Sequence, residues 1–260
     1  MRIRHLCIAL ALSFVGAVSL ASAQITVAAA SDLQFAFQDV AARFQKETGK
    51  EVKLIFGSSG NFFAQIQNGA PFDVFFSADI DYPRRLEAAG LAEPGTMYQY
   101  ATGKIVLWVR NESKLDLGRG LQALLDPSVH KIAIANPEHA PYGRAAVAAM
   151  KHENVYDKLS GKFVLGENIS QTASFVVSGA ADAGIVALSL ALASSMKEKG
   201  KYVEIPADEY PSIDQAAVIL KSSQNKEIAR QFLSFLKTPP ILDLLRTYGF
   251  SVPGDATGAH

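Results

Sequence analysis

The sequence of 260 residues contains a single cysteine, Cys7, and this residue lies in an apolar N-terminal segment. Residues 1–23 combine a basic start, an apolar stretch from Leu6 to Leu20 and the small-residue sequence Ala21-Ser22-Ala23, which is typical of a cleaved secretory signal peptide. The stretch is short for a membrane anchor. We therefore expect a mature chain that begins at Gln24, reaches the periplasm, and has no thiol, disulfide or cysteine-ligated metal.

The chain also lacks an excess of charge of either sign. The chain has 25 Lys and Arg residues against 25 Asp and Glu residues, so its formal net charge is zero. No basic stripe indicates nucleic-acid binding, and no second apolar run has membrane length. These absences leave an exported globular binding protein or enzyme, large enough for one large or two modest domains.

Signals for catalysis and for metal coordination are weak. The histidines lack metal-ligand spacing: His5, His130, His139, His152 and His260. The sequence has no Gly-x-Ser-x-Gly motif, and Ser58-Ser59-Gly60 has no identifiable base partner. Asp73, Asp79 and Asp81 could form a metal cluster, but strand-end and turn roles fit their positions better. We therefore expect a protein that is not an enzyme and needs no cofactor.

The most informative stretch runs from Leu54 to Asp79 and predicts a strand, a hydroxyl-rich turn, a helix, a glycine turn and a second strand. An apolar run ends at Gly57, and Ser58-Ser59-Gly60 then supplies two hydroxyls and free backbone N–H groups where the helix begins. The helix ends at Asn68-Gly69. This arrangement suits the binding of an anion at the helix start.

The same design recurs in a weaker copy at residues 163–189. A further strand-to-helix loop precedes each copy, at Ser31-Asp32 and at residues 137–143. Strands and helices alternate along the whole chain. We therefore predict an α/β fold of two lobes, each a mixed, mostly parallel sheet flanked by helices, with the ligand in the cleft between them.

Four loops each begin a predicted helix: Ser31-Asp32, Ser58-Ser59, Tyr142-Gly143 and Asn168-Ile169-Ser170. Any one of them alone is better explained as the N-cap of its own helix, but four in symmetric placement favour a shared oxyanion site. Hydrogen bonds to a charged group contribute about 1.5–3 kcal/mol each, and micromolar to nanomolar affinity requires about 8–12 kcal/mol. Hydrogen-bond donors alone could therefore bind the ion.

A site made only of donors suits a fully deprotonated tetrahedral dianion such as sulfate, molybdate or tungstate. Phosphate keeps a proton near neutral pH and needs an acceptor. The nearby acceptors are Asp32 and Glu167, for which a helix-dipole role and a loop-capping role fit better.

Seven motifs resemble those of the periplasmic molybdate-binding proteins, the substrate-binding component of molybdate ABC transporters. They span nearly the whole mature chain in order: Ala28–Ser31, Phe56–Ser59, Gln65–Pro71 with Asp73–Asp79, Pro137–Gly143, Gly166–Ile169, Gly184–Ala187 and Tyr248–Phe250. The resemblance implies that the chain captures molybdate, and also tungstate, and that molybdenum is present only as the bound oxyanion.

The resemblance also implies the site residues. Two serine hydroxyls and backbone amides hold the oxyanion in the family, and these roles fall on Ser31, Ser59, Tyr142 and Ile169, with Tyr142 acting through either its hydroxyl or its amide. Further candidates are Asp32, Ser58 and Ala187. Some members have a tyrosine donor at the position of Ala187, so in this chain Tyr142 or an amide such as that of Asp32 would take its place.

The family architecture implies that residues 24–101 plus 217–260 form lobe I and residues 102–216 form lobe II. The chain would cross between them near residues 101–103 and 214–217, with the C-terminal helices on lobe I. The implied partners are the membrane permease and the ATPase of an ABC importer, and we expect a monomer. The alternatives are a receptor for another tetrahedral oxyanion such as sulfate, or a periplasmic enzyme on the same two-lobed fold.

Overall fold

The computed structural model describes residues 24–255. The predicted signal peptide, with Cys7 and His5, and the C-terminal His260 lie outside the described residues. Within residues 24–255, none of the helices has both the length and the apolar character needed to cross a membrane.

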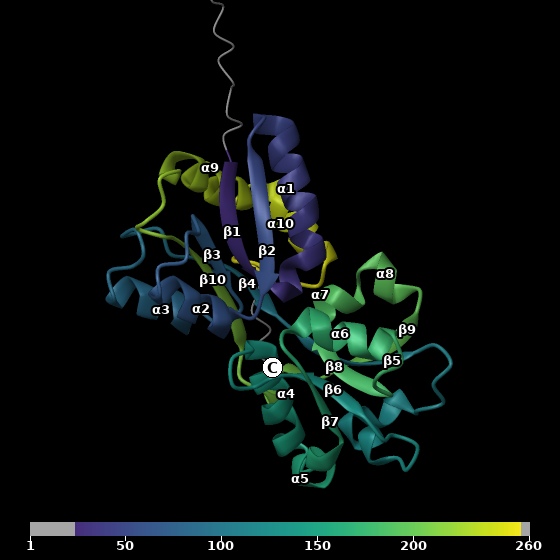
Figure 1. Ribbon diagram of the computed structural model, residues 1–260. Helices are drawn as coiled ribbons and strands as arrows, with labels where there is room; N and C mark the ends of the chain where they lie inside the picture. Colours follow the sequence, from purple (N-terminus) through teal and green to yellow (C-terminus); the bar gives the residue numbers. More distant parts are fainter. Residues whose placement is uncertain (1–23, 256–260) are drawn as a thin grey trace, which may run out of the picture.

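The chain folds into two lobes, each built on one five-stranded sheet (Figure 1). The first sheet has the order β2 (Glu51–Gly57), β1 (Gln24–Ala30), β3 (Val74–Ser77), β10 (Ile213–Ile219), β4 (Tyr98–Gly103). The second has the order β7 (Phe163–Gly166), β6 (Ile132–Ala135), β8 (Ala183–Ala187), β5 (Ile105–Arg110), β9 (Gly200–Glu204).

Both sheets have the same pairing pattern. In the first, β1 pairs in parallel with β2 and β3, whereas β10 pairs antiparallel with β3 and β4. In the second, β6 pairs in parallel with β7 and β8, whereas β5 pairs antiparallel with β8 and β9. The repeat predicted from the two sequence copies is thus present as β2-α2-β3 and β7-α6-β8. The predicted fold class is confirmed.

Helices flank both sheets. In the first lobe they are the 3-10 helix η1 (Ser31–Leu33), α1 (Gln34–Thr48), α2 (Ser59–Gln67), α3 (Asp81–Ala88), α9 (Lys226–Leu236) and α10 (Pro239–Thr247). In the second they are η2 (Leu117–Leu125), α4 (Pro141–His152), α5 (Tyr156–Leu159), η3 (Ser160–Lys162), α6 (Ile169–Val177), α7 (Leu188–Ala191), α8 (Ser194–Lys197) and η4 (Ala207–Glu209).

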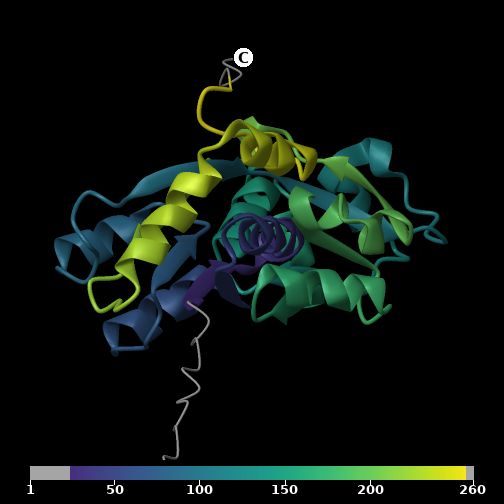
Figure 2. The same ribbon diagram turned by 90° about the horizontal axis from the view of Figure 1, so that it is seen from above.

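Hydrophobic periodicity explains how the helices pack. Helix α1 buries Phe37, Val40 and Phe44 against the first sheet, in the spacing of one helix face, and it ends at Gly49, whose φ of 70° suits glycine. The C-terminal helices pack on the same lobe through residues such as Phe232 and Ile241 (Figure 2). The second lobe has its own core around Trp108.

The chain passes between the sheets after β4 and returns before β10. The predicted lobe boundaries at 101/102 and 216/217 fall inside these two strands, and the division of the chain at those residues stays a prediction. Two local predictions were wrong. The sequence of residues 97–103 by itself predicts a connection, yet 98–103 form β4 because they pair with β10. The sequence of residues 190–199 predicts one helix, which the extended backbone of Ala193 breaks into α7 and α8.

Candidate functional site

Four helix starts converge on one cavity between the lobes. Helices η1 and α2 follow β1 and β2 of the first sheet, and α4 and α6 follow β6 and β7 of the second. Because the carboxyl ends of these strands face the junction of the lobes, the helix N-termini point toward a common space. The cavity is lined by Ala30, Ser31, Asp32, Gly57, Ser58, Ser59, Ala78, Ala140, Pro141, Tyr142 and Ile169.

The cavity is small and is lined by residues of both lobes. Its volume is about 10 Å³, which leaves room for roughly one water molecule. The lobes are therefore closed on each other in this structure. A tetrahedral ion with four oxygens would need the walls to move slightly apart, as two lobes joined by crossing strands allow.

The hydroxyls of Ser31 and Ser59 are the side-chain donors of the site. Each oxygen accepts a backbone N–H: Ser31 Oγ from Ser170 at 3.3 Å, and Ser59 Oγ from Ala78 at 2.9 Å. Within residues 24–255 neither hydroxyl donates to a protein acceptor. Both side chains are almost fully buried. Each hydroxyl hydrogen is therefore available to an anion in the cavity.

The starts of α4 and α6 add backbone donors. Tyr142 follows the initial Pro141 of α4, and Ile169 is the first residue of α6, so their N–H groups have no intrahelical acceptor. The next N–H groups along each helix are engaged, since Gly143 donates to Ala140 O and Ser170 donates to Ser31 Oγ. Tyr142 and Ile169 both line the cavity, and their amides have no acceptor among the described residues.

The phenol of Tyr142 is engaged elsewhere. Its hydroxyl donates to Asp32 Oδ2 at 2.8 Å, and Gln215 Nε2 lies 2.7 Å from the same oxygen and 2.9 Å from the phenol oxygen. Tyr100 donates in turn to Gln215 Oε1 at 2.7 Å. This buried network joins Asp32 of the first lobe to Tyr142 of the second. It leaves the amide, rather than the hydroxyl, of Tyr142 for an ion.

Burial controls the protonation of this network. Desolvation raises the pKa of Asp32 to about 6, against the lowering effect of the hydrogen bonds from Gln215 and Tyr142. Burial and the neighbouring Asp32 raise the pKa of both Tyr142 and Tyr100 well above the ordinary value. The two phenols are thus neutral donors at any physiological pH.

Ser58 differs from Ser59 in its contacts. Its Oγ lies 2.8 Å from His139 Nδ1 and 3.0 Å from His139 O, and it accepts the N–H of Asn61 at 3.4 Å as the N-cap of α2. The hydroxyl is thus engaged by protein groups although Ser58 lines the cavity. Ala187 is fully buried at the end of β8 and is not among the lining residues.

The contact between Ser58 and His139 corrects two expectations. A histidine without metal-ligand spacing is expected at the surface, yet the side chain of His139 is only 18 % exposed, with Nε2 3.7 Å from Glu167 Oε2. Ser58 was expected to lack a base partner, yet His139 supplies one from the other lobe. The sequence could not reveal this pair because closure of the lobes brings it together. The serine hydroxyl also contacts a carbonyl acceptor and is buried, so we interpret the pair as an interlobe contact.

Other interlobe contacts surround the cavity. Gly60 N donates to His139 O at 2.9 Å, and Asn61 Nδ2 donates to Glu167 Oε1. Arg144 follows the third helix start, where the sequence alone predicts a solvated face, but it pairs with Asp79 of the first lobe. These contacts hold the edges of the two lobes together over the site.

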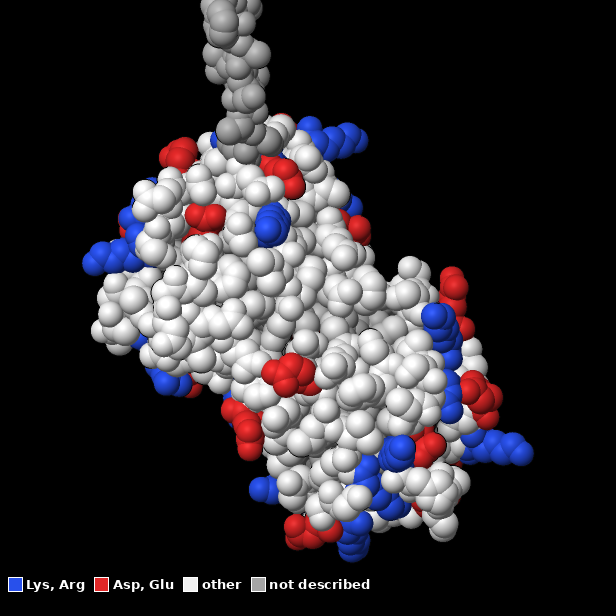
Figure 3. Space-filling view, in the orientation of Figure 1, with Lys and Arg blue, Asp and Glu red and all other residues white. Residues whose placement is uncertain are grey.

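The site contains no cation. No Lys or Arg is among the cavity-lining residues, and Arg144 is neutralised by Asp79. On the face shown in Figure 3, Lys and Arg side chains are mostly toward the outer parts of the lobes, and acidic side chains occur near the junction. An anion in the cavity would therefore be held by neutral donors.

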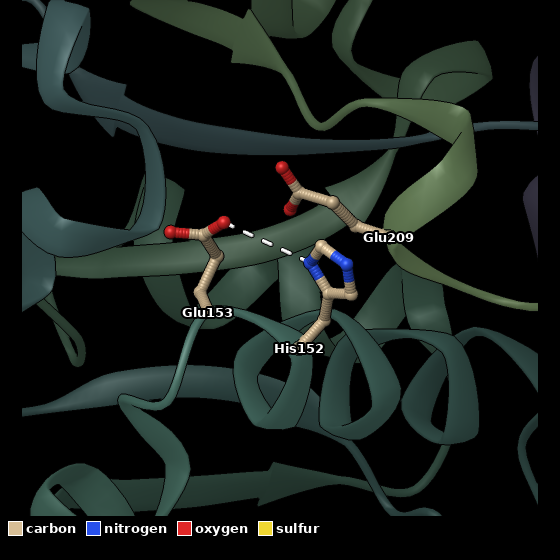
Figure 4. Close-up of side chains that lie close together, drawn as sticks. All are labelled: His152, Glu153 and Glu209. Carbon is tan, nitrogen blue, oxygen red and sulfur yellow. Dashed lines mark ion pairs between the residues drawn. The ribbon is translucent and has the colours of Figure 1, made fainter.

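A separate cluster lies at the opposite end of α4. His152, Glu153 and Glu209 point toward one another (Figure 4), each offering one ligand atom within 4.8 Å of the others. Burial, followed by the charge of Glu153, raises the pKa of Glu209. Sequence spacing did not reveal this group because Glu209 comes from η4, far along the chain. It is distinct from the oxyanion cavity.

Comparison with known proteins gives consistent results. Residues 25–251 match the family model described as bacterial extracellular solute-binding protein. The chain is 39 % identical over 242 residues to the molybdate-binding protein ModA of Rhodobacter capsulatus. The alignment covers 93 % of this chain and 94 % of the relative. The chain is 37 % identical over 232 residues to the protein of the same name from Azotobacter vinelandii, in an alignment that covers 89 % of this chain and 91 % of the relative.

Solved structures agree with these relatives. The periplasmic molybdate-binding protein of Azotobacter vinelandii superposes with a TM-score of 0.83 at 38 % identity, covering 88 % of this chain and 99 % of that one. The sulfate-binding protein SubI of Mycobacterium tuberculosis superposes with a TM-score of 0.74 at 17 % identity, and the superposition covers 90 % of this chain and 88 % of that one. The second likeness concerns the fold alone.

Proposed function

This chain belongs to the bacterial extracellular solute-binding proteins, and on that premise we propose that it is a periplasmic molybdate-binding protein that delivers its ion to an ABC importer. One observation carries the proposal: four helix starts from two lobes surround a cavity that has two free serine hydroxyls and no lysine or arginine among its lining residues. Relatives with 37–39 % identity over most of the chain are named as molybdate-binding proteins.

The proposed ligand contacts are the hydroxyls of Ser31 and Ser59 and the amides of Tyr142 and Ile169. These donors contact the oxygens of the ion, and molybdenum itself has no protein ligand. Tungstate has the same charge and shape, and we propose that it binds in the same way. No cofactor takes part in this role.

The proposal includes the cellular setting. The family works outside the cytoplasm, and the signal-peptide pattern of residues 1–23 supports export of this chain. We propose that the closed, monomeric protein docks on the permease of an importer powered by an ATPase. Closure creates a surface that spans both lobes, and a permease can recognise the loaded state from it.

Two alternatives rest on weaker support. The likeness to a sulfate-binding protein is at 17 % identity and concerns the fold. An enzyme in the same cleft would need a reactive nucleophile, and the Ser58–His139 pair is the arrangement that comes nearest. Because the relatives are named as binding proteins, we propose that this pair serves closure rather than catalysis.

Calorimetric titration of the mature protein with molybdate, tungstate, sulfate and phosphate tests the function. Molybdate and tungstate should bind with a Kd of about 1 μM or tighter, since several charge-assisted hydrogen bonds supply the required 8 kcal/mol or more. Phosphate keeps a proton near neutral pH, and Asp32 is the one carboxylate among the cavity-lining residues that could accept it, so its heat of binding shows whether Asp32 acts as an acceptor. Tight binding of sulfate together with no heat from molybdate would contradict the assignment.

A further inference from the structure

The two carboxylate oxygens of Asp32 have different surroundings. Oδ2 is contacted by the hydroxyl of Tyr142 at 2.8 Å and by Nε2 of Gln215 at 2.7 Å. Oδ1 is buried and has no partner in full hydrogen-bond geometry within the part of the chain that the structure describes, although the backbone N–H groups of Asp32 and Leu33 lie near enough to the carboxylate to lower its pKa. The residue is 1 % exposed and lines the oxyanion cavity. A buried carboxylate oxygen without such a partner, in a residue beside a cavity, calls for a ligand or a proton.

This pattern matches a neutral carboxylic acid. In such a group one oxygen is a carbonyl that accepts hydrogen bonds, and the other carries a hydrogen that it can donate. Oδ2 already accepts two hydrogen bonds, so the proton belongs on Oδ1. An ionised Asp32 would instead place a buried negative charge beside a bound dianion, which is strongly unfavourable.

We propose that Asp32 binds the oxyanion as a neutral acid, donating a hydrogen bond from Oδ1, and that the protein takes up one proton as the ion binds; this inference rests on the proposed function. The proton comes from solvent and adds to Oδ1. Oδ2 keeps its hydrogen bonds to Tyr142 and Gln215, and no bond between heavy atoms forms or breaks. Release of the ion returns the proton to solvent.

A bound oxyanion would be the main charged group near Asp32, because the side chains around Asp32 are neutral. The titratable groups that face it are Tyr142 on α4 and Tyr100 on β4, both neutral at physiological pH. Within residues 24–255 no salt bridge includes Asp32. The remaining polar side chains near η1 are uncharged: Gln34, Ser170, Ser189 and Gln215.

The direction of the pH dependence follows. Burial raises the pKa of Asp32 to about 6 in the ion-free site, so above pH 7 the group is mostly ionised before binding. A dianion beside it raises the pKa further. Binding is then linked to protonation, and affinity falls as pH rises, by about tenfold per pH unit while the free form is ionised and the bound form is protonated.

The test is calorimetry with molybdate at pH 7.5 in Tris and in HEPES, whose ionisation enthalpies differ. The wild type should take up about one proton per ion, and its affinity should fall about tenfold from pH 7 to pH 8. Asp32→Asn mimics the neutral acid, since its amide can donate to the ion while its oxygen accepts from Tyr142 and Gln215. This variant should bind molybdate with no proton uptake and no dependence on pH.

Asp243→Asn is the matched control, because Asp243 is an exposed carboxylate on α10 that pairs with Arg246 and does not line the cavity. It should keep the proton uptake of the wild type. Molybdate binding by the wild type without proton uptake overturns the role of Asp32, as does an equal uptake by Asp32→Asn. The proton uptake of the wild type tests the role of Asp32 even if a variant fails to fold. A wild type that binds no molybdate would refute the proposed function instead.

Discussion

Replacing both Ser31 and Ser59 with alanine is expected to weaken molybdate binding by roughly 3–6 kcal/mol, or about 10²- to 10⁴-fold, because two hydrogen bonds to a charged group are lost. Each serine oxygen already accepts a backbone N–H, so each hydroxyl hydrogen has the ion as its partner. The single variants should each lose about half of this free energy. Calorimetric titration measures the effect.

The same substitutions leave the amides of Ser170 and Ala78 without their acceptors, so a decrease in the free energy of unfolding is also expected. Urea unfolding of the ion-free variants separates this effect from binding. Ser160→Ala is a suitable control, since its hydroxyl donates only to Asp157 O at the surface of the second lobe. A folded double variant with wild-type affinity would remove both hydroxyls from the site.

Gly60→Ala is expected to weaken molybdate binding by obstructing closure of the lobes. A Cβ at Gly60, on the first lobe, would lie 2.6 Å from His139 O and 2.9 Å from His139 Cα on the second. These are backbone atoms that cannot rotate away. Excluding a methyl group from a packed contact costs about 1–3 kcal/mol, which corresponds to roughly a 5- to 150-fold loss of affinity.

This variant distinguishes closure from folding. The added carbon would also lie 2.8 Å from the hydroxyl of Tyr82 in the first lobe, but this is the end of a side chain that can move aside. The free energy of unfolding of the first lobe should therefore change little, while small-angle scattering should show a larger open population. Gly161→Ala is the matched control, because nothing lies within 4 Å of the added carbon. If Gly60→Ala binds as tightly as Gly161→Ala, the contact between Gly60 and His139 is not required in the loaded state.

The two-lobed fold could be predicted from the sequence because its determinants are local. Buried strands such as residues 25–30 are continuous apolar runs, and the helix starts have polar capping residues such as Ser58 and Asn168. The repeat of strand, hydroxyl-rich turn and helix then indicated two similar halves. The four helix starts that line the cavity were all identified from these local patterns.

The buried network at the junction could not be predicted. Gln215 lies in a crossing strand and Tyr100 in a segment that was expected to be a connection, and both reach Asp32 only through tertiary packing. The contact of Ser58 with His139 depends in the same way on the closed arrangement. Sequence patterns report which face of an element is apolar, but not which polar side chains meet between two lobes.

A crystal structure of the protein with molybdate, phased on the anomalous signal of molybdenum, is the most direct test. We expect a single strong peak between the starts of η1, α2, α4 and α6. The hydroxyls of Ser31 and Ser59 and the amides of Tyr142 and Ile169 should lie about 2.7–3.2 Å from the ion's oxygens. A peak elsewhere, for instance at His152, Glu153 and Glu209, or an ion held mainly by lysine or arginine, would contradict a site built from neutral donors.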